Sequence, residues 1–265
     1  MDVVLTHEQA DFDALASLLC VHLLNDKALS ILPNRLNRNV RNFLNLYGGD
    51  FPFIEARDIG PGSIRQVTLV DTQSLVTLKG INAKTAVNVV DHHDLRTDLP
   101  AYWQSRFEKV GATTTILIDL LREHALPVSM IEATLLLLGI YEDTGSLTYA
   151  STTVRDVNAA AYLLEKGASL KIAADFLNPA LSENQKKLAD LLLENAQTHN
   201  IHGKTILLSC ANAAGFSEEI SSIAHKLRDL LDPDALFLFV RTVEGVRMVA
   251  RSTSDQVDVS AVAAC

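Results

Sequence analysis

Short apolar runs, each ending abruptly in polar residues, punctuate the first third of the chain. They lie at residues 3–5, 29–32, 66–70 and 85–90 and are rich in Val and Leu. Such runs are typical of strands that are buried on both faces of a parallel sheet. Longer segments with apolar residues at helical spacing lie at 14–24, 113–124, 129–141 and 153–166. The pattern predicts an α/β fold with an open, mainly parallel sheet and helices on both faces.

A second, smaller α/β pattern begins beyond Gly203. It predicts strands at 205–208, 236–240 and 246–250 and a helix at 217–231. An amphipathic helix at 182–199 precedes them and resembles a connector between domains. The sequence therefore predicts a first domain at 1–180, a connecting helix at 181–202 and a smaller C-terminal α/β domain at 203–265.

Residues with metal-binding side chains follow three of the predicted strands. They are His7, Asp11 and Asp13 after the first strand, Asp71 after the third, and Asp91, His92 and His93 after the fourth. Ligands bind at the carboxyl edge of open α/β sheets, so these side chains are expected to share a site. A further carboxylate, Asp143, follows the helix at 129–141. We expect Gly139 and Gly145 to end that helix and to leave Asp143 exposed.

Ordinary structural roles are the alternative for these residues. An Asp just before a helix favours an N-cap, and a pair of histidines can cap a helix or fill a polar turn. Capping explains Asp11 and Asp13 less well, because like charges this close repel unless a cation lies between them. Six oxygen and nitrogen ligands without sulfur suit two divalent ions, with Mn²⁺ ahead of Mg²⁺. The candidate ligands are His7, Asp11, Asp13, Asp71, His92 and Asp143, and Asp71, alone on its loop, is the best bridge between two ions.

Composition limits the other classes of function. The chain has 265 residues, and its formal net charge of −9 argues against a broad electrostatic surface for nucleic acid. Cys20, Cys210 and Cys265 are far apart in sequence, so disulfides and thiolate zinc sites are not expected. No apolar run reaches the roughly 18 residues of a membrane helix, and no leader precedes the first strand. These features predict a soluble cytoplasmic protein without a membrane partner, and a homodimer is among the oligomeric states left open.

Three arginines, Arg35, Arg38 and Arg41, recur at three-residue spacing in the segment 33–47, which has helical character. A solvated helix face is the more common explanation of such a stripe, and contact with phosphates is the alternative.

Four motifs together resemble those of the DHH phosphoesterase superfamily, which is named for the tripeptide Asp91-His92-His93. In order they are His7-x-x-x-Asp11-x-Asp13-Ala14, Val70-Asp71, Asp91-His92-His93 and Asp143-Thr144-Gly145, and the similarity covers roughly residues 1–180. The resemblance implies that His7 and Asp11 bind one metal ion, that Asp13, His92 and Asp143 bind the other, and that Asp71 bridges them. It also implies two-metal, Mn²⁺-dependent hydrolysis of a phosphoester, with Asp71 and His93 as catalytic residues and His93 facing the substrate phosphate.

The segment 247–252 resembles a strand of the C-terminal substrate-binding domain associated with this family. The resemblance implies that Arg251 and Ser252 bind substrate. In the family, that domain continues into a glycine-rich segment that ends in His, and this sequence reaches Cys265 without one. The second domain is therefore expected to be partial, and the sequence leaves open whether the chain is part of a longer protein.

Hydrolysis of short oligonucleotides or nucleoside bisphosphates is the leading functional expectation. Residues 10–17 and 41–44 resemble the N-terminal part of fusion proteins in which a DHH domain precedes nucleotide-sensing domains and a tRNA nucleotidyltransferase. The alternative is therefore an RNA-binding, end-trimming or regulatory module of a larger tRNA-processing protein. An inorganic pyrophosphatase ranks third, because its compact substrate requires a strongly basic clamp and Arg251 alone is thin support for one.

Overall fold

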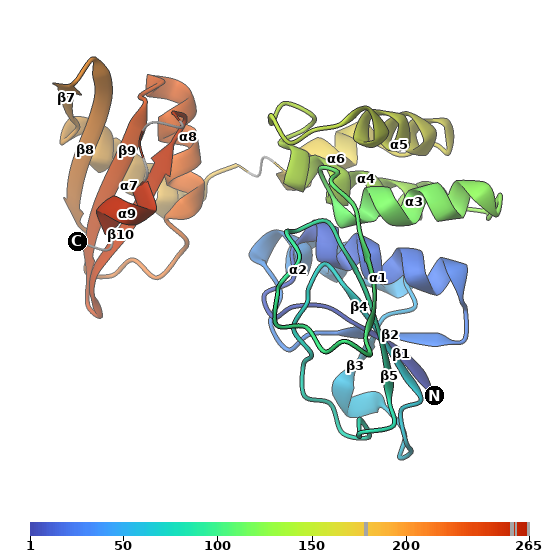
Figure 1. Ribbon diagram of the computed structural model, residues 1–265. Helices are drawn as coiled ribbons and strands as arrows, with labels where there is room; N and C mark the ends of the chain where they lie inside the picture. Colours follow the sequence, from blue (N-terminus) through green and yellow to red (C-terminus); the bar gives the residue numbers. More distant parts are fainter. Residues whose placement is uncertain (178–179, 255–256, 258, 264–265) are drawn as a thin grey trace. The chain divides into compact units, whose positions relative to one another are not determined.

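The computed structural model describes residues 1–177, 180–254, 257 and 259–263. The chain divides into two compact units, Met1–Pro179 and Ala180–Cys265, each with its own hydrophobic core (Figure 1). The division lies next to the boundary expected after residue 180.

A six-stranded sheet in the order β3-β2-β1-β4-β5-β6 forms the centre of the first unit, and every neighbouring pair is parallel. The strands are β1 (Asp2–Leu5), β2 (Ala28–Leu32), β3 (Ile54–Glu55), β4 (Gln66–Val70), β5 (Ala86–Asp91) and β6 (Gln104–Phe107). The mainly parallel α/β sheet is thereby confirmed. The strand order reverses between β1 and β4, and ligands bind at such a switch point, outside the carboxyl ends of the strands.

Helix α1 (Phe12–Leu24) lies between this sheet and helices α3 (Thr113–Glu123) and α4 (Met130–Thr144) (Figure 1). All its residues from Phe12 to Cys20 are buried, which explains why this helix is apolar on every side. The remaining helices of the unit are α2 (Arg38–Tyr47), η1 (Gly48–Asp50), η2 (Ala56–Asp58), α5 (Val154–Glu165) and α6 (Leu170–Leu177). Among the described residues of the whole chain, no helix has both the length and the apolar character needed to cross a membrane.

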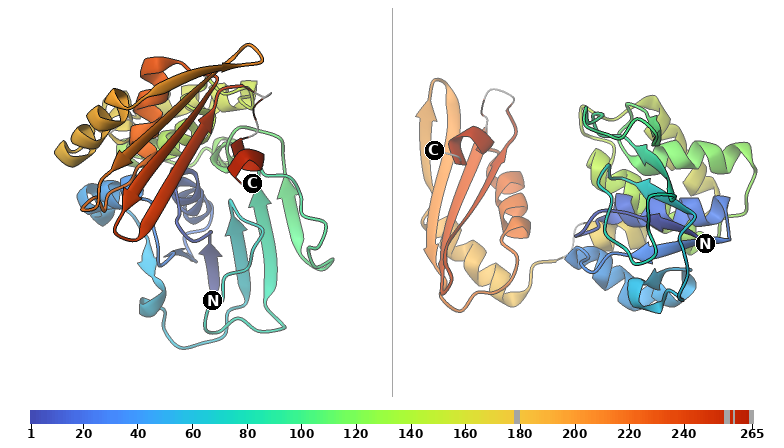
Figure 2. Two further views of the ribbon diagram at one scale, coloured as in Figure 1. Left: turned by 90° about the vertical axis from the view of Figure 1, so that its left-hand side faces the viewer. Right: turned by 60° about the horizontal axis from the view of Figure 1, so that its bottom comes forward.

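The opposite face of the sheet carries a second core, which includes Leu5, Leu69 and Val89. The short 3₁₀ helix η2 and the loops that contain Leu78 and Trp103 cover this face (Figures 1 and 2). Helices lie on both faces, as predicted, but they differ in kind. Within the described residues, α-helices pack on one face and the short 3₁₀ helix η2 contributes to the other.

Helix α4 continues through Gly139 and ends only at Gly145, so the expectation that Gly139 ends it is wrong. A Cβ at position 139 would lie 2.7 Å from the Cβ of Ala16 and 2.9 Å from Oγ1 of Thr114, so glycine allows α4 to approach α1 and α3 closely. Gly145 has a φ of 56°, the left-handed conformation that commonly ends helices. Asp143 therefore lies in the last turn of α4, and its side chain is only 22% exposed.

A four-stranded sheet in the order β10-β9-β8-β7 forms the second unit. Its elements are α7 (Glu183–Glu194), β7 (Gln197–Ile201), β8 (Lys204–Asn212), α8 (Ser221–Leu231), β9 (Ala235–Thr242), β10 (Gly245–Ser252) and α9 (Val259–Ala263). Strands β8 and β9 pair in parallel, whereas the two outer pairs are antiparallel. Helices α7 and α8 pack against one face around Leu192, Leu227 and Leu238, so the smaller α/β domain is confirmed.

The connecting helix is shorter than the range 181–202 that the sequence predicted. Helix α7 is capped by Ser182 and ends at Glu194, and Gln197–Ile201 pair with β8 instead. All five residues of β7 are exposed, so no alternation of apolar and polar residues marks this strand in the sequence. Leu188 and Leu192 of α7 are buried in the core of the second unit, so the helix belongs to that unit and does not merely connect two domains.

Candidate metal centre

The carboxyl ends of three adjacent strands, β1, β4 and β5, bring the predicted metal-binding residues together, and the last turn of α4 adds Asp143. Ligand atoms gather in three groups, within each of which they lie no more than 4.8 Å apart. The groups are His7, Asp11 and Asp71; Asp13, Asp71, His92 and Asp143; and Asp71, Asp91, His92 and His93. All six predicted ligands therefore belong to one cluster, and Asp71 is common to its three groups.

Asp71 lies between two imidazoles. Its Oδ2 is 3.3 Å from Nε2 of His7, and its Oδ1 is 3.7 Å from Nε2 of His92. The hydroxyl of Thr113 donates a hydrogen bond of 3.0 Å to Oδ1, and the side chain is only 2% exposed. The backbone has a φ of 56°, in the left-handed region that non-glycine residues rarely adopt and that is enriched at functional sites. Each oxygen of Asp71 thus faces a different histidine.

His7 and His92 present the same ring nitrogen to the cluster. Nδ1 of His7 lies 2.8 Å from the carbonyl oxygen of Glu8, and Nδ1 of His92 lies 3.2 Å from that of Val110. A carbonyl only accepts, so Nδ1 donates in both rings and Nε2 is the nitrogen that faces the carboxylates. Histidines that bind metal ions are commonly oriented in this way, with the other ring nitrogen donating to a backbone carbonyl.

The concentration of carboxylates makes the cluster bind protons tightly in the absence of a metal ion. The interaction with Asp71 raises the pKa of His7 to about 9. Burial lowers the pKa of His92, but the neighbouring carboxylates of Asp143 and Asp71 outweigh it and raise the pKa to about 9. Burial and the charge of Asp71 raise the pKa of Asp11 to about 6. Nε2 of His92 is also buried without a hydrogen bond of good geometry among the described residues. Divalent cations would replace these protons, so the residues present fit a metal centre.

Asp11 and Asp13 combine a structural role with a place in the cluster. Asp11 is the N-cap of α1, and its Oδ1 accepts from the backbone N–H of Ala14 at 3.0 Å. Asp13 is fully buried, and its two oxygens accept from the N–H groups of Thr113 and Thr114 at 2.7 and 2.9 Å. A carboxylate oxygen can accept more than one interaction, so these bonds leave room for a metal ion. Capping and metal binding are compatible here.

His93 differs from the other two histidines because its Nδ1 lies 2.8 Å from Oδ1 of Asp91. The other oxygen of Asp91 accepts a hydrogen bond of 3.0 Å from the buried amide of Gln73, which also accepts from the backbone N–H of Arg96. Both oxygens of Asp91 are therefore engaged in holding the loop, although Asp91 lies close enough to be grouped with possible ligands. The His93 side chain is 60% exposed, so its ring is fixed at one nitrogen and open to solvent.

Sequence reasoning missed Gln73 and two carboxylates that join distant segments, of which Glu142 is half-buried and Asp156 is fully buried. Glu142 accepts from the backbone N–H of Phe12 at 2.5 Å, and burial with the charge of Asp11 raises its pKa to about 8. Asp156 accepts from the backbone N–H of Gly111 and from the hydroxyls of Thr115 and Thr153. The position of Glu142, next to Asp143, was one available signal. Thr153, three residues before Asp156, forms a capping box with it, but nothing nearby in sequence marks the contact of Asp156 with Gly111.

Comparison with known proteins identifies this arrangement. Residues 3–140, about half of the chain, match the sequence profile described as "DHH family, N-terminal domain". The chain belongs to the DHH family. The motif tripeptide of this DHH domain therefore provides His92 to the cluster, Asp91 to the support beneath it and His93 to its open side.

Two kinds of enzyme are among the relatives of the DHH chain. An A-adding tRNA nucleotidyltransferase of Geobacter sulfurreducens is 37% identical over 99% of this chain, and this chain spans 30% of its length. A Listeria innocua protein, described as a probable manganese-dependent inorganic pyrophosphatase, is 31% identical over 68% of this chain and 61% of its own length. The crystal structure of an exopolyphosphatase-related protein from Bacteroides fragilis has a TM-score of 0.71 and covers 95% of this chain and 79% of that one, at 17% identity. The shared α/β fold is confirmed by this likeness.

Arg251 and Ser252, the predicted substrate-binding residues, lie outside the matched part of the DHH family. They are consecutive on β10, where side chains alternate between the two faces of the sheet. Val249 packs into the core on the helix side and Ala250 into the core on the other side, so Arg251 and Ser252 point to opposite faces. The hydroxyl of Ser252 lies 3.1 Å from the carbonyl oxygen of Asp234 and 2.9 Å from that of Ser254, and it can donate its hydrogen to either. The structure does not bring the two side chains to one surface of this unit, and their role in substrate binding stays a prediction.

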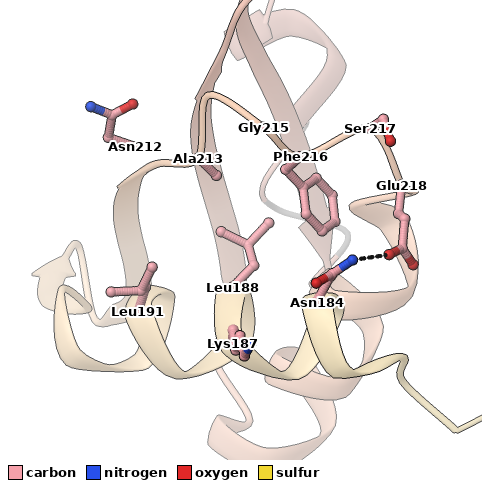
Figure 3. Close-up of a pocket in the computed structure, with 10 residues that line it drawn as sticks. All are labelled: Asn184, Lys187, Leu188, Leu191, Asn212, Ala213, Gly215, Phe216, Ser217 and Glu218. Atoms are coloured by element: carbon pink, nitrogen blue, oxygen red, sulfur yellow. Dashed lines mark hydrogen bonds between the residues drawn. The ribbon is translucent and has the colours of Figure 1, made fainter.

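A hollow of about 230 Å³ lies in the second unit between α7 and the loop that leads to α8 (Figure 3). Phe216 and Leu188 face each other across it, and the amide of Asn184 donates to Glu218 at 3.1 Å (Figure 3). The full lining is Asn184, Lys187, Leu188, Leu191, Asn212, Ala213, Gly215, Phe216, Ser217 and Glu218. Its ionisable side chains, Lys187 and Glu218, do not form a metal-binding set, so the DHH cluster is the candidate site.

Proposed function

We propose that this DHH domain is a manganese-dependent phosphoesterase that binds two metal ions and hydrolyses phosphodiester or phosphomonoester bonds of short oligonucleotides or nucleoside bisphosphates. The observation that carries the proposal is the position of Asp71, whose two oxygens face His7 and His92 separately. A carboxylate in that position suits a bridge between two cations. The manganese-dependent pyrophosphatases among the relatives support Mn²⁺ as the metal, with Mg²⁺ as the second choice.

His7 and Asp11 would hold one ion, and Asp13, His92 and Asp143 the other, with Asp71 shared. Bound divalent cations supply Lewis acidity that activates water and offsets the charge of a phosphoryl group. Thr113 orients Asp71 through its hydroxyl, and the N–H groups that hold Asp13 fix the direction of that carboxylate. These supporting bonds hold the ligands in place before substrate binds.

His93 would contact the substrate phosphate. Asp91 accepts a hydrogen bond from its Nδ1, and this hydrogen bond raises the pKa of His93, which favours the charged form of the ring, with a proton on Nε2 as well. A protonated imidazole at the open side of the cluster can donate to a phosphate oxygen and can give its proton to the leaving oxygen. The Asp91–Gln73 pair beneath it keeps the ring in one orientation.

The His93→Ala variant is expected to lose turnover by about 10²-fold or more, the scale of a positioned acid–base group. Its metal content should stay normal, because His93 uses Nδ1 to bind Asp91 rather than an ion. The measurement combines steady-state hydrolysis with metal analysis of the purified protein. The matched control is His124→Ala, which removes an exposed imidazole at the C-cap of α3 and should change neither quantity. A His93→Ala protein with an empty metal site would show that the role assigned to this residue is wrong.

A second candidate function is an RNA-binding or end-trimming module of a larger tRNA-processing protein. The A-adding tRNA nucleotidyltransferases of Geobacter sulfurreducens and Aquifex aeolicus favour it, since they match 99% and 97% of this chain while the chain spans 30% of each. A pyrophosphatase is the third candidate, favoured by the manganese-dependent relatives. The three candidate functions share the metal centre and differ in the substrate or partner that would bind at it.

Chelation of divalent ions is expected to abolish hydrolysis, and Mn²⁺ should restore it better than Ca²⁺, which is larger and coordinates more loosely. The assay measures product release from a short RNA, a short DNA, adenosine bisphosphate and pyrophosphate. Turnover of the oligonucleotides or the bisphosphate supports the leading proposal, whereas turnover of pyrophosphate alone would replace it with the third candidate. Full activity in excess chelator would exclude a metal-dependent mechanism.

A further inference from the structure

The segment 33–47 has a charge pattern unlike that of the whole chain. Its fifteen residues include three arginines and five asparagines but no Asp or Glu, although the chain as a whole carries a net charge of −9. Arg35 precedes helix α2, and Arg38 and Arg41 lie in its first two turns. All three side chains are exposed. We call Arg35, Arg38 and Arg41 the arginine strip.

The arginine strip begins beside the metal-binding loop. Strands β1 and β2 are parallel neighbours, so the loops that follow them lie at the same edge of the sheet. The two loops are joined directly: the N–H of Gln9 donates to the carbonyl of Arg35 at 3.0 Å, and the N–H of Asn37 donates to that of Ala10 at 2.9 Å. Gln9 and Ala10 lie between the predicted ligands His7 and Asp11. The backbone of Arg35 is therefore fixed to the loop that carries one half of the metal cluster.

Helix α2 holds the strip in a defined orientation. Val40 and Phe43 are fully buried in the core, and Phe43 packs edge to face against Phe12 of α1 with ring centroids 5.7 Å apart. Residues three apart share a helix face, so Arg38 and Arg41 project together on the side opposite this buried pair. Arg41 also donates to the carbonyl of Leu36 at 3.1 Å, which ties the first turns of the helix to the loop.

We propose that the arginine strip binds the phosphates of a single-stranded nucleic acid whose reacting phosphate lies at the metal cluster. The inference rests on the proposed phosphoesterase function and narrows its substrate class to chains with several phosphodiester links. Arginine is suited to phosphate because its guanidinium can donate two parallel hydrogen bonds. A compact anion such as pyrophosphate would be contained within the cluster and would have no phosphate left for a strip that extends along α2. The five asparagines of the segment add uncharged donors and acceptors for sugars and bases.

The test compares two double variants that each remove two positive charges. Arg35→Gln with Arg38→Gln changes the strip, while Lys79→Gln with Lys84→Gln changes exposed charges in the loop that precedes β5, at the opposite edge of the same sheet. Binding of a labelled single-stranded RNA of about ten nucleotides is measured in chelator at several salt concentrations. The strip variant should bind about tenfold more weakly, and the slope of its salt dependence should fall by about 0.7 for each phosphate that is no longer bound. The loop variant should bind like the unchanged protein.

Equal binding by the strip variant and the unchanged protein would overturn the proposal, as would equal losses in both double variants. The double variant Arg35→Lys with Arg38→Lys keeps the positive charge of the strip and should recover most of the binding. Single-stranded DNA should show the same loss as RNA, and a loss confined to RNA would argue for recognition of the 2′-hydroxyl instead of phosphate. Because binding is measured without metal ions, a protein that binds through the strip but hydrolyses nothing would refute the proposed function alone.

Under turnover conditions the strip variant should raise the KM for RNA and leave kcat nearly unchanged, since contacts away from the reacting phosphate contribute mainly to uniform binding. Its metal content should equal that of the unchanged protein. A fall in kcat with loss of metal would show that the arginines support the His7–Asp11 loop and would overturn the assignment of a binding role.

Discussion

Asp71→Asn is expected to remove metal binding and hydrolysis together, lowering turnover on the order of 10³-fold or more. The amide keeps the shape of the side chain but carries no negative charge, and a group between two cations contributes to holding both. Loss of several kcal/mol of charge stabilisation at the reacting phosphate corresponds to a rate change of that size. The measurements are metal content by elemental analysis and initial rates in excess Mn²⁺.

Asp26→Asn provides the control for that substitution, because it makes the same chemical change at an exposed position between α1 and β2. It should leave both metal content and rate intact. An Asp71→Asn protein that retains two ions and normal turnover would show that Asp71 is neither a ligand nor a bridge.

Asp156→Ala is expected to lower the free energy of unfolding of the first unit by about 3 kcal/mol. The carboxylate is fully buried and accepts from the N–H of Gly111, from the hydroxyl of Thr115 and from both the N–H and the hydroxyl of Thr153. Alanine would leave these buried donors without partners, which costs more than the hydrogen bonds themselves contribute. The pKa of Asp156 is lowered despite its burial, because the hydrogen bonds from Thr115 and Thr153 favour the charged form.

Urea denaturation followed by tryptophan fluorescence measures the free energy of unfolding of the first unit of the structure. The single tryptophan of the chain, Trp103, lies in the first unit, so its signal reports on that unit. Asp175→Ala removes an exposed carboxylate from α6 and should change the free energy of unfolding by less than about 0.5 kcal/mol. Equal stability of the Asp156→Ala protein and the unchanged protein would mean that the loop at Gly111 is held by other contacts.

The sequence predicted that the Asp and His residues of the cluster lie close together, because all of them except Asp143 follow strands that could be recognised one at a time. Asp71 and Asp91 each come directly after an apolar run, and the parallel arrangement places such positions at one edge. The edge strands β3 and β6 escaped prediction, since one has two residues and the other reads Gln-Ser-Arg-Phe without an apolar run. The error at α7 has the same origin, because an exposed strand such as β7 has no buried face to impose a pattern.

The supporting residues could not be predicted because their partners are distant in sequence. Asp13 is held by N–H groups about a hundred residues away, and Asp156 accepts from Gly111 forty-five residues earlier. Local spacing carries no information about such pairs. The expectation that Gly139 ends α4 is wrong for a related reason. The small size of Gly139 allows close contact with Ala16 on α1, and it does not break α4.

The cluster joins the first strand of the unit to the end of its fourth α-helix, through His7 and Asp143. Between these two positions the chain must complete five further strands and three α-helices in the described structure, so no small fragment of the unit contains the full set of ligands. The opening of this site is therefore expected to follow the cooperative unfolding of the whole unit, and the amide hydrogens around Asp71 and Asp13 should exchange with solvent no faster than those of the core.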